Sequence, residues 1–169
     1  SGTLLLCDEH GTPLSPGLMY DDRRGQHAAA SIAAHAPPDS AARGGGSALA
    51  RLLWLNAERP PGRRPGHALH QAEWLTARLL GRVGLGDENN CLKLGFDPRT
   101  GRWPAWLADL GVPRAQLPHV GPSGRPLGPP DPALARALGL PQDLQLIAGT
   151  TDSVAAALAT GLSAPGDAA

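Results

Sequence analysis

The sequence is poor in the features that mark several large classes of protein. No run of like charge exceeds two residues, and 15 basic residues balance 15 acidic ones, so charge gives no reason to expect nucleic acid or an anionic membrane as partner. No stretch approaches the about 18 continuous apolar residues of a membrane span, and the N-terminus lacks the basic start and apolar run of a signal peptide. We therefore expect a protein that is neither exported nor embedded in a membrane.

Cysteine and lysine are also scarce. Cys7 and Cys91 lie far apart and show no CxxC spacing, so neither a disulfide framework nor a zinc site is indicated, and a reducing cytoplasm fits best. Lys93 is the single lysine beside fourteen arginines, a bias that we ascribe to the coding genome rather than to chemistry. The sequence also begins without methionine and passes almost at once into an apolar run, which we interpret as a truncation.

What is present suits one folded domain. The chain has 169 residues, of which 41% are apolar, and this is enough to build a single core. Residues 3–20 are typical of a β-hairpin that turns at 8–11. Pro13 and Pro16 make the second arm of this hairpin short or place it at an edge, because proline has no N–H for a strand ladder.

Helical patterns fill much of the remaining chain. Ser47 stands at the N-cap of one helix, which ends at Pro60, and Gly81 is the expected C′ residue of a helix over 67–80. Further elements are predicted in the order helix 24–35, loop 84–101, helix 103–110, Pro/Gly-rich stretch 118–132, helix 132–138, buried strand 144–148 and helix 152–160. This order predicts an α/β fold with helices inserted between the strands of a sheet.

The strongest candidate site is the turn Gly149-Thr150-Thr151-Asp152-Ser153, between the apolar strand and the last helix. Asp152 would stand at the carboxyl end of a strand, where α/β sheets hold their ligands. A carboxylate there can take a proton from a substrate hydroxyl as that oxygen attacks phosphorus, and the neighbouring glycine lets a ligand approach the backbone. The alternative, which spacing alone favours, is that Asp152 only caps the helix.

A second candidate follows the hairpin, at residues 19–24. Asp21 and Asp22 stand beside Tyr20, and this combination suits a sugar because carboxylates accept hydrogen bonds from hydroxyls while an aromatic ring covers an apolar face. The commoner outcome for such a segment is a solvated turn in which one of the two aspartates caps the next helix.

Three weaker features have simpler explanations. Residues 87–90 could form a divalent-cation loop, but they lack the EF-hand pattern and a polar loop is the better interpretation. His67 and His70 are three residues apart, as two metal ligands on one helix face would be, yet no third ligand is indicated. The four tryptophans, at positions 54, 74, 103 and 106, are expected to belong to the core.

Five segments, in order along nearly the whole chain, resemble the FGGY carbohydrate kinases. They are SGTLLLCD at 1–8, PGLMYDDR at 16–23, LHQAEWL at 69–75, DENNCLKLGFDP at 87–98 and AGTTDS at 148–153. The Asn-Asn-x-Leu-Lys-x-Gly-x-Asp-Pro and Gly-Thr-Thr-Asp-Ser forms are most similar to the branch of D-ribulose and D-xylulose kinases. The resemblance implies an actin-like pair of ribonuclease H-like domains, with the sugar and ATP meeting in the cleft between them.

The resemblance also implies roles for single residues. Asp152 takes the position of the general base, and the substrate-binding positions are Ser1, Gly2, Tyr20, Asp22 and Ser153. It implies ATP and Mg²⁺ as cofactors and a small sugar as the partner, such as D-ribulose or D-xylulose, with no nucleic acid and no membrane. It leaves room for a homodimer.

Family members carry an Asp-x-Gly-Thr phosphate turn upstream of these segments and adenosine-binding glycines in a second domain downstream. Neither is found in residues 1–169, which are therefore expected to be most of the sugar-binding first domain, incomplete at its N-terminus and without the nucleotide-binding domain. Expressed alone, such a piece is expected to be marginally stable or aggregated and to phosphorylate no pentulose.

Two other functions stay open at this point. One is a noncatalytic remnant of such a kinase that binds a sugar or only a partner chain. The other is a hydrolase in which Asp152 and Asp22 act as paired carboxylates, a hypothesis that no motif supports.

Overall fold

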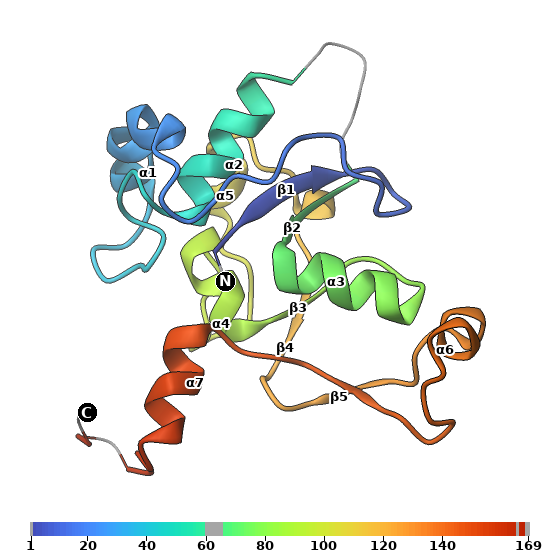
Figure 1. Ribbon diagram of the computed structural model, residues 1–169. Coiled ribbons are helices and arrows are strands. Elements are labelled where there is room, and N and C mark those ends of the chain that lie inside the picture. Colours follow the sequence, from blue (N-terminus) through green and yellow to red (C-terminus); the bar gives the residue numbers. More distant parts are fainter. Residues whose placement is uncertain (1, 60–65, 165, 168–169) are drawn as a thin grey trace.

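The computed structural model describes residues 2–59, 66–164 and 166–167, arranged as Figure 1 shows. The strands are β1 (Leu4–Cys7), β2 (His67–His70), β3 (Leu85–Asp87), β4 (His119–Gly121), β5 (Pro126–Gly128) and β6 (Leu146–Ile147). The α-helices are α1 (Ala29–His35), α2 (Ala48–Ala57), α3 (Gln71–Leu80), α4 (Glu88–Cys91), α5 (Trp106–Asp109), α6 (Pro132–Leu138) and α7 (Asp152–Ala159). Three short 3-10 helices are η1 (Arg24–Ala28), η2 (Leu92–Leu94) and η3 (Arg114–Gln116).

The strands pair two by two. β1 and β2 are antiparallel, β3 and β4 are parallel, and β5 and β6 are antiparallel. Helices separate the strands along the chain, as predicted, and the α/β class is confirmed. The ladders described do not join into one sheet, so the site is held by contacts between these pairs and the helices rather than by one continuous ladder.

The predicted hairpin is present, with an irregular second arm. Its turn is held by Asp8, whose Oδ1 accepts hydrogen bonds from the backbone N–H groups of His10 and Thr12 at 2.9 and 2.8 Å. The returning chain meets β1 only at single bridges, Cys7 with Pro13 and Leu4 with Leu18. Proline has no N–H to donate, which explains why the returning arm forms no regular strand.

The core lies between β1, α2 and the η1–α1 segment. Alternate residues of β1 point to opposite sides, so Leu4 and Leu6 join the main apolar cluster while Leu5 and Cys7 join a smaller one with Leu69. The main cluster takes fully buried side chains from α1 and α2, including Ile32, Leu49 and Leu52. Trp54, Trp103 and Trp106 pack against it and Trp74 packs against the smaller cluster, so the prediction of core tryptophans is confirmed.

Helix α2 begins where its cap signal predicts. The hydroxyl of Ser47 accepts a hydrogen bond from the N–H of Ala50 at 3.1 Å, which satisfies one of the free donors of the first turn.

The predicted helix at 67–80 is wrong in its first turn. Residues 67–70 form β2 because their backbone pairs with β1, with Leu5 opposite Leu69, and α3 starts only at Gln71. Gly81 does end α3 in a left-handed conformation, as predicted.

The loop predicted at 84–101 is also wrong, because it contains β3, α4 and η2 in short succession. The Asp87 carboxylate starts α4 by accepting hydrogen bonds from the N–H groups of Asn89 and Asn90 at 3.1 and 2.9 Å. The strand predicted at 144–148 is limited to Leu146–Ile147 and is not buried, since Ile147 is 50% exposed.

The C-terminal part of the chain stands apart from the core, as Figure 1 shows for α6 and α7. Neither helix buries a residue, and Leu138 and Leu158 are 57% and 61% exposed. Among the residues that the structure describes, no helix has the length and apolar character needed to cross a membrane.

Candidate functional site

A cavity of about 580 Å³ lies where seven segments of the chain meet. These are the residues before β1, the end of the hairpin, the α1–α2 loop at Ala41, the start of α2, the β2–α3 junction, the α4–η2 run and the start of α7. Four of the predicted site residues, Gly2, Tyr20, Asp152 and Ser153, line this one cavity although they come from three separate parts of the chain. Ser1 lies outside the described residues.

Asp152 is the first residue of α7 and is exposed at the cavity. The N-cap of the helix is Thr151, whose hydroxyl accepts a hydrogen bond from the N–H of Val154 at 3.3 Å. Asp152 Oδ1 accepts one from the N–H of the next residue, Ser153, at 2.8 Å. The capping role is therefore taken by Thr151, and Asp152 follows it on the wall of the cavity.

The turn before α7 is tied to α4. The Asn89 side chain donates to the hydroxyl of Thr150 at 2.8 Å and to that of Ser123 at 2.9 Å. No atom lies within 4 Å of the place where a side chain at Gly149 would begin, so the backbone is open to approach there. Asn89 itself lines the cavity, which makes it a link between the cavity wall and Thr150, two residues before Asp152.

Tyr20 and Gly2 form a facing wall. Tyr20 is 67% exposed and its neighbour Met19 is 56% exposed, so both present side-chain surface that a ligand in the cavity can contact. Gly2 has a φ of 83°, and a Cβ at this position would lie 3.3 Å from that of Tyr20. Glycine thus allows both the left-handed backbone and the close approach.

Asp22 does not line the cavity. Its carboxylate forms a paired contact with the guanidinium of Arg24, at 3.0 Å from Nε and 2.6 Å from Nη2, and also accepts the backbone N–H of Arg24 at 3.0 Å. These hydrogen bonds hold the pKa of Asp22 below its usual value. Arg24 in turn stacks over Trp54, 4.5 Å from the ring centroid. The structure therefore separates Asp22 from the other predicted residues and places it in a turn before η1.

No model of a known protein family matches the chain. Its fold, however, is found in solved structures. A xylulose kinase from Rhodospirillum rubrum is 27% identical, with a TM-score of 0.83 over 98% of this chain and 36% of that one. A ligand-bound xylulose kinase from Lactobacillus acidophilus is 16% identical, with a TM-score of 0.81 over 95% of this chain and 34% of that one. A Plasmodium falciparum glycerol kinase with ADP is 15% identical, with a TM-score of 0.78 over 95% and 34%.

The structural neighbours are FGGY-type carbohydrate kinases. This confirms the resemblance that the sequence segments predicted, and the fold is that of the actin-like ATPases. The chain spans about a third of the length of the structures it matches.

Within this kinase fold, Arg51 is the cavity residue that sequence reasoning missed most completely. It is 1% exposed, and its guanidinium donates to the backbone carbonyl oxygens of Gly2, Tyr20 and Gly46 at 2.8, 2.9 and 3.0 Å. Burial lowers the pKa of Arg51, and the nearby charges of Asp22 and Asp21 oppose that shift. Because the three carbonyls belong to three segments of the cavity wall, Arg51 holds that wall together. The sequence offered one indication of this role, which is that Arg51 is a charged residue inside the apolar run 48–55.

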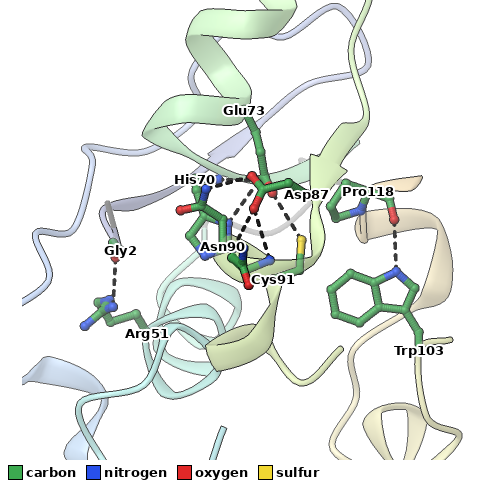
Figure 2. Close-up of polar contacts among 10 residues, drawn as sticks. Gly2, Arg51, His70, Glu73, Asp87, Asn90, Cys91, Trp103 and Pro118 are labelled. Carbon is green, nitrogen blue, oxygen red and sulfur yellow. Dashed lines mark hydrogen bonds and ion pairs between the residues drawn. The ribbon is translucent and has the colours of Figure 1, made fainter. Parts of the chain in front are cut away.

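Next to the cavity lies a buried polar network, which Figure 2 shows converging from β2, α3 and α4. The Glu73 carboxylate accepts the His70 backbone N–H at 2.7 Å, contacts His70 Nδ1 at 3.0 Å and accepts the Cys91 thiol at 3.2 Å. Asn90 donates to the buried Asp87 carboxylate at 2.7 Å. Residues 87–90, for which a polar loop was the favoured interpretation and a cation loop the alternative, are instead the cap and first turns of α4.

The side chains of His70, Glu73 and Cys91 are close enough to hold a metal ion, with ligand atoms within 4.8 Å of one another. Their distances of 3.0 and 3.2 Å are those of hydrogen bonds. Burial, together with the charge of Glu73, raises the pKa of the Cys91 thiol well above its usual value, so the proton needed for its hydrogen bond is retained. We interpret the cluster as support for the cavity floor, which His70 and Asn90 line. His67 and His70 both belong to β2, so the helical pair of metal ligands that their spacing allowed, and that we considered the weaker interpretation, does not form.

Proposed function

We propose that the protein carrying this chain is an ATP-dependent carbohydrate kinase that phosphorylates a ketopentose, such as D-ribulose or D-xylulose, with Asp152 as general base. The observation that carries this proposal is the single cavity lined by Gly2, Tyr20, Asp152 and Ser153. Its volume of about 580 Å³ falls within the range of about 300–1,000 Å³ that is typical of small-molecule sites.

The cavity offers the chemistry that a sugar requires. Asp152 presents a carboxylate that can take the proton of an attacking hydroxyl, which makes that oxygen a better nucleophile toward phosphorus. Gln71 lines the same cavity, and its exposed side-chain amide can donate hydrogen bonds to, and accept them from, hydroxyls that do not react. The exposed ring of Tyr20 offers an apolar face.

ATP and Mg²⁺ belong to the proposed reaction, but the described residues do not fit them. The glycines at 44–46 are not followed by the Lys-Ser/Thr pair of a phosphate loop. Asp152 is the one carboxylate among the described residues that line the cavity, and Mg²⁺ sites use carboxylates together with the nucleotide phosphates. We therefore assign to this chain the sugar and the base, and no step of nucleotide binding.

Three further parts of the proposal concern the substrate, the domain and the compartment. The xylulose kinases among the structural neighbours favour a pentulose substrate. The coverage of about a third of each neighbour favours a sugar-binding domain at 1–169 that works with a nucleotide-binding domain. The two buried free cysteines favour a reducing compartment, the cytoplasm.

The test is Asp152→Asn in the full-length protein. An amide cannot take the proton, so we expect kcat for phosphorylation of the preferred pentulose to fall by about 10²–10⁴-fold while the sugar Kd from calorimetry changes little. Asp109→Asn is the matched control, because Asp109 is another exposed helix aspartate and lies outside the cavity. A near-normal kcat in Asp152→Asn would show that Asp152 is not the general base.

A further inference from the structure

Lys93 lines the same cavity as Asp152 and has no role in the reaction proposed above. It is the middle residue of η2, whose neighbours Cys91 and Leu94 are fully buried, so its backbone is held firmly. The side chain is exposed, and it forms no hydrogen bond or ion pair with any residue that the structure describes. An exposed ammonium on the wall of a cavity, without a protein partner, is available to a ligand.

The position of Lys93 relative to the base follows from the α4–η2 run. Lys93 comes four residues after Asn89 and three after Asn90, and residues at these separations share one face of a helix. Both asparagines line the cavity. Asn89 reaches Thr150, two residues before Asp152, at 2.8 Å. The face that carries Lys93 is therefore tied directly to the turn that carries the base.

The charged side chains that line the cavity differ in whether they can bind a substrate. Arg51 also lines it, but its guanidinium is occupied by the carbonyl oxygens of Gly2, Tyr20 and Gly46. Asp152 is the one carboxylate among the described residues that line the cavity, and its proposed role is to take the proton of the attacking hydroxyl. This leaves the ammonium of Lys93 as the cation among the described lining residues that can meet a substrate oxygen.

The choice of lysine is notable in this chain. Fourteen of the 15 basic residues are arginine, so arginine is the ordinary basic residue here and lysine the exception. The two side chains are not equivalent, since an ammonium is a compact group with three donors whereas a guanidinium is a wide planar fork. A compact donor suits the oxygen atoms of a small polyhydroxy ketone better than the fork, which matches planar carboxylates and phosphates.

Building on the proposed function, we propose that Lys93 is a specificity-determining residue whose ammonium donates hydrogen bonds to an oxygen of the sugar other than the one that attacks phosphorus. It thereby selects substrates that present an oxygen at that place. A pentulose has more oxygen atoms to offer than glycerol, so Lys93 favours the pentulose over the smaller polyol.

The experiment compares Lys93→Met and Lys93→Arg with the wild type in the full-length protein. Kd values for D-ribulose, D-xylulose and glycerol are measured by calorimetry without nucleotide, and kcat and KM are measured with ATP. For Lys93→Met we expect the Kd and KM of the preferred pentulose to rise about 10–100-fold, with kcat within about threefold and glycerol binding nearly unchanged, because the lost hydrogen bond is to a group that does not react. For Lys93→Arg we expect the pentulose Kd to remain more than about threefold above the wild-type value.

Arg78→Met is the matched control, since Arg78 is an exposed helix cation outside the cavity, and it should leave all these constants unchanged. An unchanged pentulose Kd in Lys93→Met, or a wild-type Kd in Lys93→Arg, overturns the proposal. If the wild type binds a pentulose but does not phosphorylate it, the kinase assignment fails and the Kd comparison still decides the role of Lys93. If the wild type binds none of the three sugars, both proposals fail.

Discussion

The two sides of the candidate cavity are built differently. The wall that contains Arg51 is part of the main core, where Leu49 and Leu52 are fully buried and the Arg51 guanidinium joins three backbone segments. The opposite side is the start of α7, a helix that buries no residue and is tied to α4 through Asn89. The wall that contains Arg51 is thus held by the packing of the core, whereas the proposed base is carried by a helix that buries no residue. Elements that move during function are drawn from such regions of low local stability.

The largest expected effect is a difference in the free energy of unfolding between a variant in the core and a variant in α7. Leu49→Ala should lower the free energy of unfolding by about 2–5 kcal/mol because it leaves a cavity in the core, whereas Leu158→Ala, on the exposed helix, should change it by no more than about 0.5 kcal/mol. Urea denaturation of the two variants measures the difference. An equally large loss for Leu158→Ala would show that another part of the protein buries α7.

A second prediction concerns the tie between the two sides. Asn89→Ala removes the hydrogen bonds to Thr150 and Ser123, so we expect the free energy of unfolding to fall by about 1 kcal/mol. We expect kcat to fall more than tenfold, because small displacements of a catalytic group cost about 10²-fold. Steady-state kinetics and urea denaturation on the same samples test both effects.

The matched control for this variant is Asn56→Ala. The Asn56 amide also makes two side-chain hydrogen bonds, both with Gln116 and at 3.1 and 2.9 Å, but it does not line the cavity. It should lose similar stability and keep its kcat. A normal kcat in Asn89→Ala would mean that the position of Asp152 does not depend on α4.

The smallest effect is expected at Asp22. Asp22→Ala should raise KM for the pentulose by about two- to tenfold with little change in kcat, because the Asp22–Arg24 contact fixes the chain two residues after Tyr20, and a displaced Tyr20 weakens binding in the ground state and the transition state alike. Asp39→Ala is its control, since Asp39 also pairs with an arginine, Arg99, at 2.8 Å and likewise lies outside this cavity, but it is distant in sequence from Tyr20. A KM that is unchanged for D-ribulose, D-xylulose and glycerol would limit Asp22 to its role in the turn.

The features predicted correctly from sequence are those with a local cause. Ser47 caps α2 through the N–H three residues later, and Gly81 ends α3 through its own backbone conformation. The turn with Asp152 at the start of a helix was likewise visible from an apolar pair of residues followed by small ones. Each of these signals acts within one turn of the chain, so the neighbouring residues are enough to recognise it.

The features missed depend on residues far apart. Residues 67–70 have an apolar pattern that fits a helix, and they became a strand because β1, more than 60 residues earlier, offers a free edge. Arg51 could not be recognised as part of the site because one of its partners, the carbonyl of Gly2, is 49 residues away. Asp152 and Asp22 were the first and second candidates, and only the folded arrangement shows that Asp152 lines the cavity while Asp22 is engaged by Arg24.

The contacts of Arg51 have a consequence for how this site can diversify. Its guanidinium binds main-chain oxygen atoms, which every amino acid possesses, and it makes no described hydrogen bond to a side chain. The side chain of Tyr20 is exposed, and a Cβ at Gly46 would meet no atom within 4 Å. Replacements at these two positions can therefore alter which ligands the wall accepts while the frame that shapes it stays in place, so that recognition and architecture can evolve as separate traits.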